Sequence, residues 1–110
     1  ETRRGGSRVD CTQLTNLVNK ESAYLLDVRP KNEFEMGAIA GSINIPFESF
    51  EARQDELLKA KDNHIILICK MGRNAALAGE KLQKNGHKET YILKGGISTW
   101  QQEGLPLVEI

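Results

Sequence analysis

The chain has 110 residues, of which 39% are hydrophobic and 27% charged, so it is long enough to bury one core without disulfide bonds. Fifteen basic and fifteen acidic residues cancel, so overall charge gives no reason to expect nucleic acid or an anionic membrane as the main partner. Cys11 and Cys69 lie far apart in unlike contexts, and no run of about 18 apolar residues is present. We therefore expect a single globular domain with free thiols in the reducing cytoplasm.

The first seven residues differ from the rest of the chain because they are polar, basic and glycine-containing. This composition is typical of a linker, so we expect residues 1–7 to be a linker or a remnant of the expressed chain, and residues 8–110 to be the domain. Alternatively, residues 1–7 are the juxtamembrane end of a missing N-terminal anchor. The domain would then be the cytosolic part of a membrane-anchored protein, and a membrane would be a partner only in that case.

The first half of the chain predicts alternating strands and helices. Val9 is expected in a short strand, and Asp10 is suited to cap a helix with Cys11 packed in its first turn. The apolar run 23–28 predicts a second strand, followed by a short helix over 31–36. Residues 43–45 predict a third strand, which a proline ends. The first helix is expected to bury Leu14, Leu17 and Val18, and the second to begin after Pro30 and to end at Gly37.

The second half continues the alternation. A helix after Pro46 is expected to present one apolar face made of Phe47, Phe50, Leu57 and Leu58. Residues 65–68 have the composition of a strand covered on both faces, and a helix over 74–85 is expected to pack closely on the sheet through Ala76, Ala78 and Gly79. Residues 90–93 predict a strand and 97–103 a last helix. The order predicts an α/β fold, a mostly parallel sheet of about five strands with helices on both faces.

Cys69 directly follows the most apolar predicted strand. In parallel sheets, ligand sites lie at the carboxyl ends of strands, where backbone N–H groups and the positive end of a helix dipole favour an anion. Lys70 and Arg73 add positive charge there, and Gly72 permits a turn that a Cβ would hinder. The backbone N–H groups of Met71, Gly72, Arg73 and Asn74 are expected to form an anion-binding nest. We interpret Cys69 as a reactive thiolate; the alternative is a buried structural cysteine followed by an ordinary turn.

A second group of charged residues follows the predicted strand 23–28. Asp27, Arg29 and Glu33 are expected near the same sheet end as Cys69, where they would support the site. An equally acceptable interpretation is a set of capping contacts and surface ion pairs. His64 and His87 each stand alone, without other residues at metal-ligand spacing, so neither is expected to bind a metal.

Several separated motifs together resemble the single-domain rhodaneses, or thiosulfate sulfurtransferases. The resemblance covers about residues 9–108 and is specific because the motifs occur together. The segment 69–74 is similar to the six-residue active-site loop of that family. The first and closing signatures are similar to Leu26-Asp27-Val28-Arg29, Glu33-Phe34 and Gly37 to Pro46, and to Leu93-Lys94-Gly95-Gly96, Trp100, Gly104 and Pro106.

This resemblance implies the rhodanese-like three-layer fold and a sulfurtransferase. Cys69 would take a sulfane sulfur from a donor such as thiosulfate, become a persulfide, and pass the sulfur to cyanide or another thiophilic acceptor. Loop N–H groups from Lys70 through Asn74 would hold the transferred sulfur, and Lys70 and Arg73 would attract the donor. The resemblance implies no metal and no organic cofactor. The partners would be a small sulfur-containing anion and a thiophilic acceptor, with a protein acceptor as a further candidate.

Two positions depart from the family pattern. Many members carry arginine at the sixth loop position, where this chain has Asn74, and histidine where this chain has Ala38. The first change removes an ion pair that would join the loop to Asp27 or Glu33. Asn74 is instead suited to cap the following helix.

Two other functions fit parts of the sequence. The fold also resembles the catalytic domain of dual-specificity phosphatases, whose loop is one residue longer and would require arginine at position 75. Ala75 stands there, which disfavours phosphate-ester hydrolysis. The second alternative is a rhodanese-like binding module whose cysteine carries sulfur or senses oxidation for a protein partner, with weak thiosulfate turnover.

Overall fold

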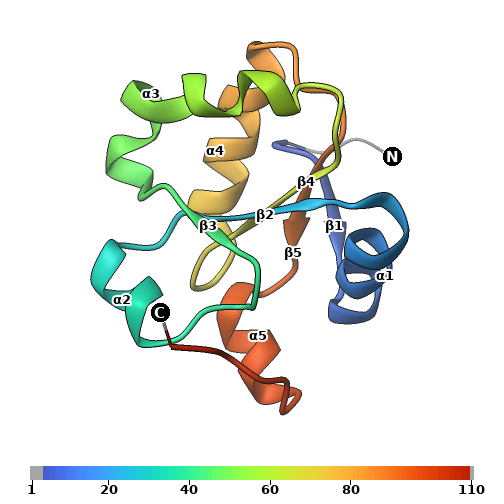
Figure 1. Ribbon diagram of the computed structural model, residues 1–110, viewed down its shortest axis with the longest axis vertical. Helices are drawn as coiled ribbons and strands as arrows, with labels where there is room; N and C mark the ends of the chain where they lie inside the picture. Colours follow the sequence, from blue (N-terminus) through green and yellow to red (C-terminus); the bar gives the residue numbers. More distant parts are fainter. Residues whose placement is uncertain (1–3, 110) are drawn as a thin grey trace.

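A computed structural model describes residues 4–109 and shows a five-stranded parallel sheet with helices on both faces (Figure 1), which confirms the predicted α/β fold. The strand order is β1-β5-β4-β2-β3, so the strand before Cys69 is central. The elements, in chain order, are β1 (Ser7–Val9), α1 (Cys11–Glu21), β2 (Tyr24–Asp27), α2 (Lys31–Met36), β3 (Ile43–Asn44), the 3₁₀-helix η1 (Phe47–Ser49), α3 (Phe50–Arg53), the 3₁₀-helix η2 (Gln54–Ala60), β4 (Ile65–Ile68), α4 (Arg73–Lys84), β5 (Thr90–Leu93) and α5 (Gly96–Gln102).

Strand β4 is buried on both faces because each face carries its own hydrophobic core. Ile65 and Leu67 point to the face covered by α3, η2 and α4, whereas Ile66 and Ile68 point to the face covered by α1 and α5. Figure 1 shows α1 and α4 on opposite sides of the sheet. The continuous apolar run of β4 is thus the pattern expected of a central parallel strand.

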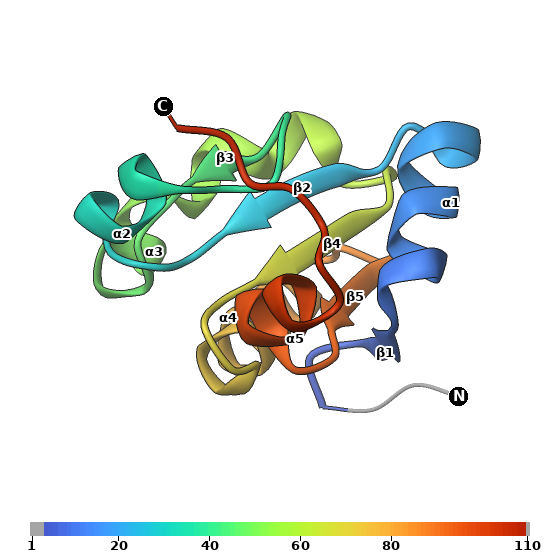
Figure 2. The ribbon, with the colours of Figure 1, turned by 90° about the horizontal axis from the view of Figure 1, so that it is seen from below.

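The predicted element boundaries agree closely with the structure. Helix α1 is capped by a box in which Asp10 Oδ1 accepts from the Gln13 backbone N–H at 2.7 Å and Gln13 Oε1 accepts from the Asp10 N–H at 2.8 Å. Helices α4 and α5 each begin and end one residue before the predicted ranges. The chain end runs back past α5 toward α2 and β3 (Figure 2), where Val108 pairs with Ala38 through two backbone hydrogen bonds.

The predicted single helix after Pro46 is wrong in detail. The segment is a 3₁₀ turn, one short α-helix and a second 3₁₀-helix. With three residues per turn, η2 places Leu57 and Ala60 on the same buried side and turns Leu58 outward, where it is 51% exposed. Leu58 therefore does not belong to the apolar face, whereas Phe50 and Leu57 do.

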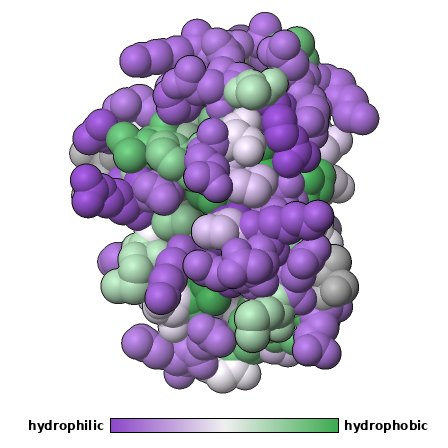
Figure 3. Space-filling model, turned by 90° about the vertical axis from the view of Figure 1, so that its left-hand side faces the viewer, coloured by the Kyte–Doolittle hydropathy of each residue, from purple (hydrophilic) through white to green (hydrophobic). Residues whose placement is uncertain are grey.

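The surface near α2 and α3 is largely hydrophilic, and its hydrophobic atoms form separate patches (Figure 3). Met36, at the end of α2, is the most exposed large hydrophobic residue of the described chain at 79%. Within residues 4–109, no helix is long and apolar enough to cross a membrane.

Residues 4–6 pack against α4. Gly5 and Gly6 are buried with positive φ angles of 82° and 129°. A Cβ on Gly79 would lie 2.2 Å from the Gly5 carbonyl oxygen, so this glycine makes room for the N-terminal segment and not, as predicted, for the sheet. Ser7, the last residue of the proposed linker, already belongs to β1. Residues 1–3 of that linker lie outside the described residues, so the domain boundary stays a prediction.

The buried His87 predicts a pH-dependent stability. Burial and the nearby Lys61 lower the pKa of His87 below its ordinary value, and its Nδ1 has no hydrogen-bond partner among the described residues. Because the unfolded chain binds this proton more readily, the free energy of unfolding should fall as the pH drops below about 6.5. We expect His87→Leu to lose less stability between pH 7 and pH 5 than the wild type in urea denaturation. Equal losses in the two proteins would assign the pH dependence to other groups.

Candidate active site

Cys69 lies one residue beyond β4, at the carboxyl end of the sheet. It is 5% exposed and is followed by a three-residue turn before α4. Gly72 has a φ of 111°, a conformation that side chains with a Cβ rarely adopt. The turn therefore folds the chain tightly around the cysteine sulfur.

The sulfur of Cys69 accepts two backbone hydrogen bonds from this turn. The Gly72 N–H donates to Sγ with a nitrogen–sulfur distance of 2.8 Å, and the Ala75 N–H donates with 3.4 Å. Ala75 is the third residue of α4, so Sγ takes the position that an N-cap oxygen usually holds. Two donated N–H groups and the helix dipole favour an anionic sulfur at this point.

The expectation that Asn74 caps α4 is wrong. Gly72 occupies the cap position and makes no side-chain cap hydrogen bond. Asn74 is the second residue of α4 and is exposed, so it lies inside the helix and not at the cap position before it. It lines a cavity of about 220 Å³ with Pro46 and Phe47.

The outer side of the loop is held by the start of α5. The Ile97 N–H donates to the Cys69 carbonyl at 2.9 Å, and the Ser98 N–H donates to the Lys70 carbonyl at 3.2 Å. A Cβ on Gly96 would lie 2.3 Å from the Cys69 carbonyl oxygen, so this position needs glycine. Sequence reasoning missed this support, although the Gly95-Gly96 pair was the signal that marked it.

The loop side chains point outward to different surroundings. Met71 is 67% exposed, and its Sδ accepts a hydrogen bond from the Ser98 hydroxyl at 3.3 Å. Lys70 lines a cavity of about 510 Å³ together with Arg29, Glu33 and Met36. Arg73 lines another cavity, of about 490 Å³, on the side of α4 and β1. Lys70 and Arg73, the two cations of the loop, therefore line separate cavities.

Asp27 and Arg29 form a buried ion pair. The Arg29 guanidinium donates to both Asp27 carboxylate oxygens at 2.8–3.1 Å, and Asp27 is fully buried. Arg29 Nη2 also donates to the Gly37 carbonyl at 2.7 Å, and Asn44 Nδ2 donates to the carbonyls of Asp27 and Arg29 at 2.9 and 3.0 Å. The pair thus fixes the chain after β2 and is neither a cap nor a surface pair; only Arg29 and the exposed Glu33 reach a cavity shared with the loop.

Cys11 differs from Cys69 in its surroundings. It lies in the hydrophobic core on the other face of the sheet and is 2% exposed. Burial, followed by the nearby Glu103, raises the pKa of the Cys11 thiol. A buried thiol that resists ionisation is a packing residue, which agrees with its predicted role.

Comparison with known proteins shows the family of the chain. Residues 10–103 match the family described as Rhodanese-like domain. The chain is 38% identical over 97 residues to the Escherichia coli protein YibN, covering 87% of this chain and 68% of YibN. It is 28% identical to a protein of Allochromatium vinosum named sulfurtransferase, covering 93% of this chain and 94% of that one.

A solved structure gives the same result for the fold. The rhodanese-related protein of Thermoplasma volcanium superposes with a TM-score of 0.82 at 31% identity, covering 93% of this chain and 97% of that one. The topology on which Cys69 is placed is therefore shared with that structure.

Proposed function

Because the chain belongs to the rhodanese-like domain family, we propose that it is a sulfurtransferase that carries sulfane sulfur as a persulfide on Cys69. Relatives that bear the name sulfurtransferase support transfer of a sulfur group as the reaction class. The proposal rests on one observation: the backbone N–H groups of Gly72 and Ala75 both donate hydrogen bonds to Cys69 Sγ.

The first step is attack of the Cys69 thiolate on the outer sulfur of a donor such as thiosulfate. A sulfur–sulfur bond forms to Sγ, the bond between the two thiosulfate sulfurs breaks, and sulfite leaves with the electron pair. The Gly72 and Ala75 N–H groups, which donate to Sγ, would stabilise the negative charge on the transferred sulfur, and Lys70 and Arg73 would attract the dianionic donor.

In the second step a thiophilic acceptor attacks the outer sulfur of the persulfide. With cyanide, thiocyanate forms and the Cys69 thiolate leaves, which restores the free enzyme. The proposed reaction is thus of the thiosulfate:cyanide sulfurtransferase type. The groups proposed for both steps are side chains and backbone N–H groups of this chain.

Thiocyanate production from thiosulfate and cyanide tests the proposal. We expect Cys69→Ser to abolish turnover, whereas Cys11→Ser, the matched control in the opposite core, should keep it. An aryl phosphate tests the phosphatase alternative in the same samples. Turnover of that ester above sulfur transfer, or full thiocyanate production by Cys69→Ser, would overturn the proposal.

A second candidate function is sulfur delivery to a protein. Met36 and Met71 are highly exposed at the edges of cavities beside the loop, and exposed methionines adapt well to protein partners. If this chain acts chiefly as a carrier or redox-sensing module, Cys69 should load with sulfur in one turnover while steady thiocyanate production stays slow. Rapid steady turnover would favour the enzyme.

A further inference from the structure

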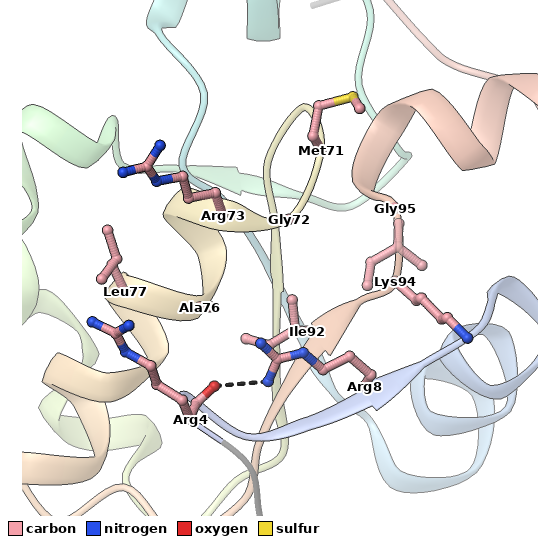
Figure 4. Close-up of a pocket in the computed structure, with 11 residues that line it drawn as sticks. Arg4, Arg8, Met71, Gly72, Arg73, Ala76, Leu77, Ile92, Lys94 and Gly95 are labelled. Atoms are coloured by element: carbon pink, nitrogen blue, oxygen red, sulfur yellow. Dashed lines mark hydrogen bonds between the residues drawn. The ribbon is translucent and has the colours of Figure 1, made fainter.

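The cavity beside Arg73 is unusually rich in positive charge. It measures about 490 Å³ and lies between α4 and the ends of β1 and β5. Among the described residues that line it, four are cationic, namely Arg4, Arg8, Arg73 and Lys94, and none is acidic. In Figure 4, the Arg8 guanidinium lies in the middle of the hollow, with Arg4 and Arg73 toward α4. Since the whole chain has no net charge, this excess is local.

The existing contacts of these cations leave positive charge available. Arg8 Nη1 donates to the carbonyls of Arg4 and Gly6 at 2.7 and 2.8 Å, which are neutral acceptors. Arg4 Nε forms an ion pair with Glu80 at 2.7 Å, and the Arg4 side chain is 64% exposed. Within residues 4–109, Arg8 is therefore held in place by neutral acceptors and has no acidic partner, a state suited to an anionic ligand.

The cavity borders the loop that holds the reactive sulfur. Met71 and Gly72 line it, and the Gly72 N–H is one of the two groups that donate to Cys69 Sγ. The apolar part of the cavity wall is formed by Ala76, Leu77 and Ile92. A volume of this size suits a small molecule with a short carbon skeleton and several charges.

We propose that this cavity binds the body of a small thiol acceptor that carries two or more carboxylates. The inference rests on the proposed function and names its acceptor class. The carboxylates would lie against Arg4, Arg8 and Arg73 while the acceptor thiolate reaches the persulfide past Gly72. The thiolate attacks the outer sulfur, the bond between that sulfur and Sγ breaks, and Cys69 leaves as a thiolate; the product is the persulfide of the acceptor.

Single-turnover transfer from persulfidated protein tests this acceptor class. Mercaptosuccinate, with two carboxylates, is compared with the neutral 2-mercaptoethanol, each rate being corrected for the thiolate fraction. We expect mercaptosuccinate to be favoured, and each lost charge in Arg4→Gln and Arg8→Gln to lower the ratio of the two rates about threefold. Rising salt should lower the same ratio. Lys84→Gln, at the far end of α4, is the matched control and should leave the ratio unchanged.

Two further measurements separate the possible failures. Arg8→Lys keeps the charge, so it should retain most of the preference; a loss equal to that of Arg8→Gln would indicate a structural role and overturn the proposal. Tricarballylate, which has three carboxylates and no thiol, should shift the amide NMR signals of Arg8 and Gly72 in unmodified protein. That binding needs no sulfur transfer, so it is independent of the proposed function. No shift and no preference for mercaptosuccinate would overturn the cavity assignment.

Discussion

Replacement of Gly96 by alanine is expected to slow sulfur transfer about 100-fold, because small displacements of a reactive group cost rates of this order. The added Cβ would lie 2.3 Å from the Cys69 carbonyl oxygen and 2.6 Å from that of Lys70. Both contacts are with backbone, so no side chain can rotate away. Gly96 also has a φ of 61°, which disfavours residues with a Cβ. The loop must therefore move, and its N–H groups would leave their positions around Sγ. The rate of persulfide formation from thiosulfate measures the effect.

Gly104→Ala is the matched control for this substitution. Gly104 has a similar φ of 75°, but nothing lies within 4 Å of its added Cβ. It should lose a little stability through backbone strain and keep its rate of sulfur transfer. If Gly96→Ala reacts as fast as Gly104→Ala while circular dichroism shows both folded, α5 does not position the loop.

Asp27→Asn is expected to destabilise the fold by about 3–5 kcal/mol, because it leaves the Arg29 guanidinium buried without its countercharge. Asp27 is fully buried, and Arg29 is 7% exposed. The guanidinium also donates to the Gly37 carbonyl, so the end of α2 should loosen with it. Urea denaturation at pH 7 measures the change in the free energy of unfolding.

An exposed ion pair in the next helix provides the control. Lys31 and Glu35 lie 3.9 Å apart on the surface of α2, and Glu35→Gln should leave stability nearly unchanged. If Asp27→Asn were as mild as Glu35→Gln, the buried pair would contribute little to the fold. The Asp27 result also tests whether this residue acts mainly through stability, since its carboxylate is paired with Arg29 at 2.8 Å.

The strands and the reactive cysteine could be predicted because their signals are local. The apolar run 65–68 indicates a strand buried on both faces, and Cys69 with Gly72 indicates a turn at its carboxyl end. The helix after Pro46 was less predictable, since a spacing of three residues, as between Leu57 and Ala60, fits both an α-helix and a 3₁₀-helix.

The parts that escaped prediction depend on contacts between distant segments. The ion pair between Asp27 and Arg29 is local, but nothing in the sequence indicates that it is buried or that Asn44, 17 residues after Asp27, donates to the Asp27 carbonyl. The cationic cavity likewise brings Arg8 of β1 beside Arg73 of α4, and such a meeting follows only from the strand order β1-β5-β4. Residue types predicted the chemistry, while the topology determined which charges share a cavity.

Mass spectrometry after treatment with thiosulfate tests the central proposal most directly. We expect the wild type to gain one sulfur atom, located at Cys69 by peptide analysis and removed by a reducing thiol. Cys11→Ser should gain the same sulfur, and Cys69→Ser should gain none. No added sulfur on the folded wild type at any thiosulfate concentration, or an equal gain in Cys69→Ser, would contradict a persulfide on Cys69.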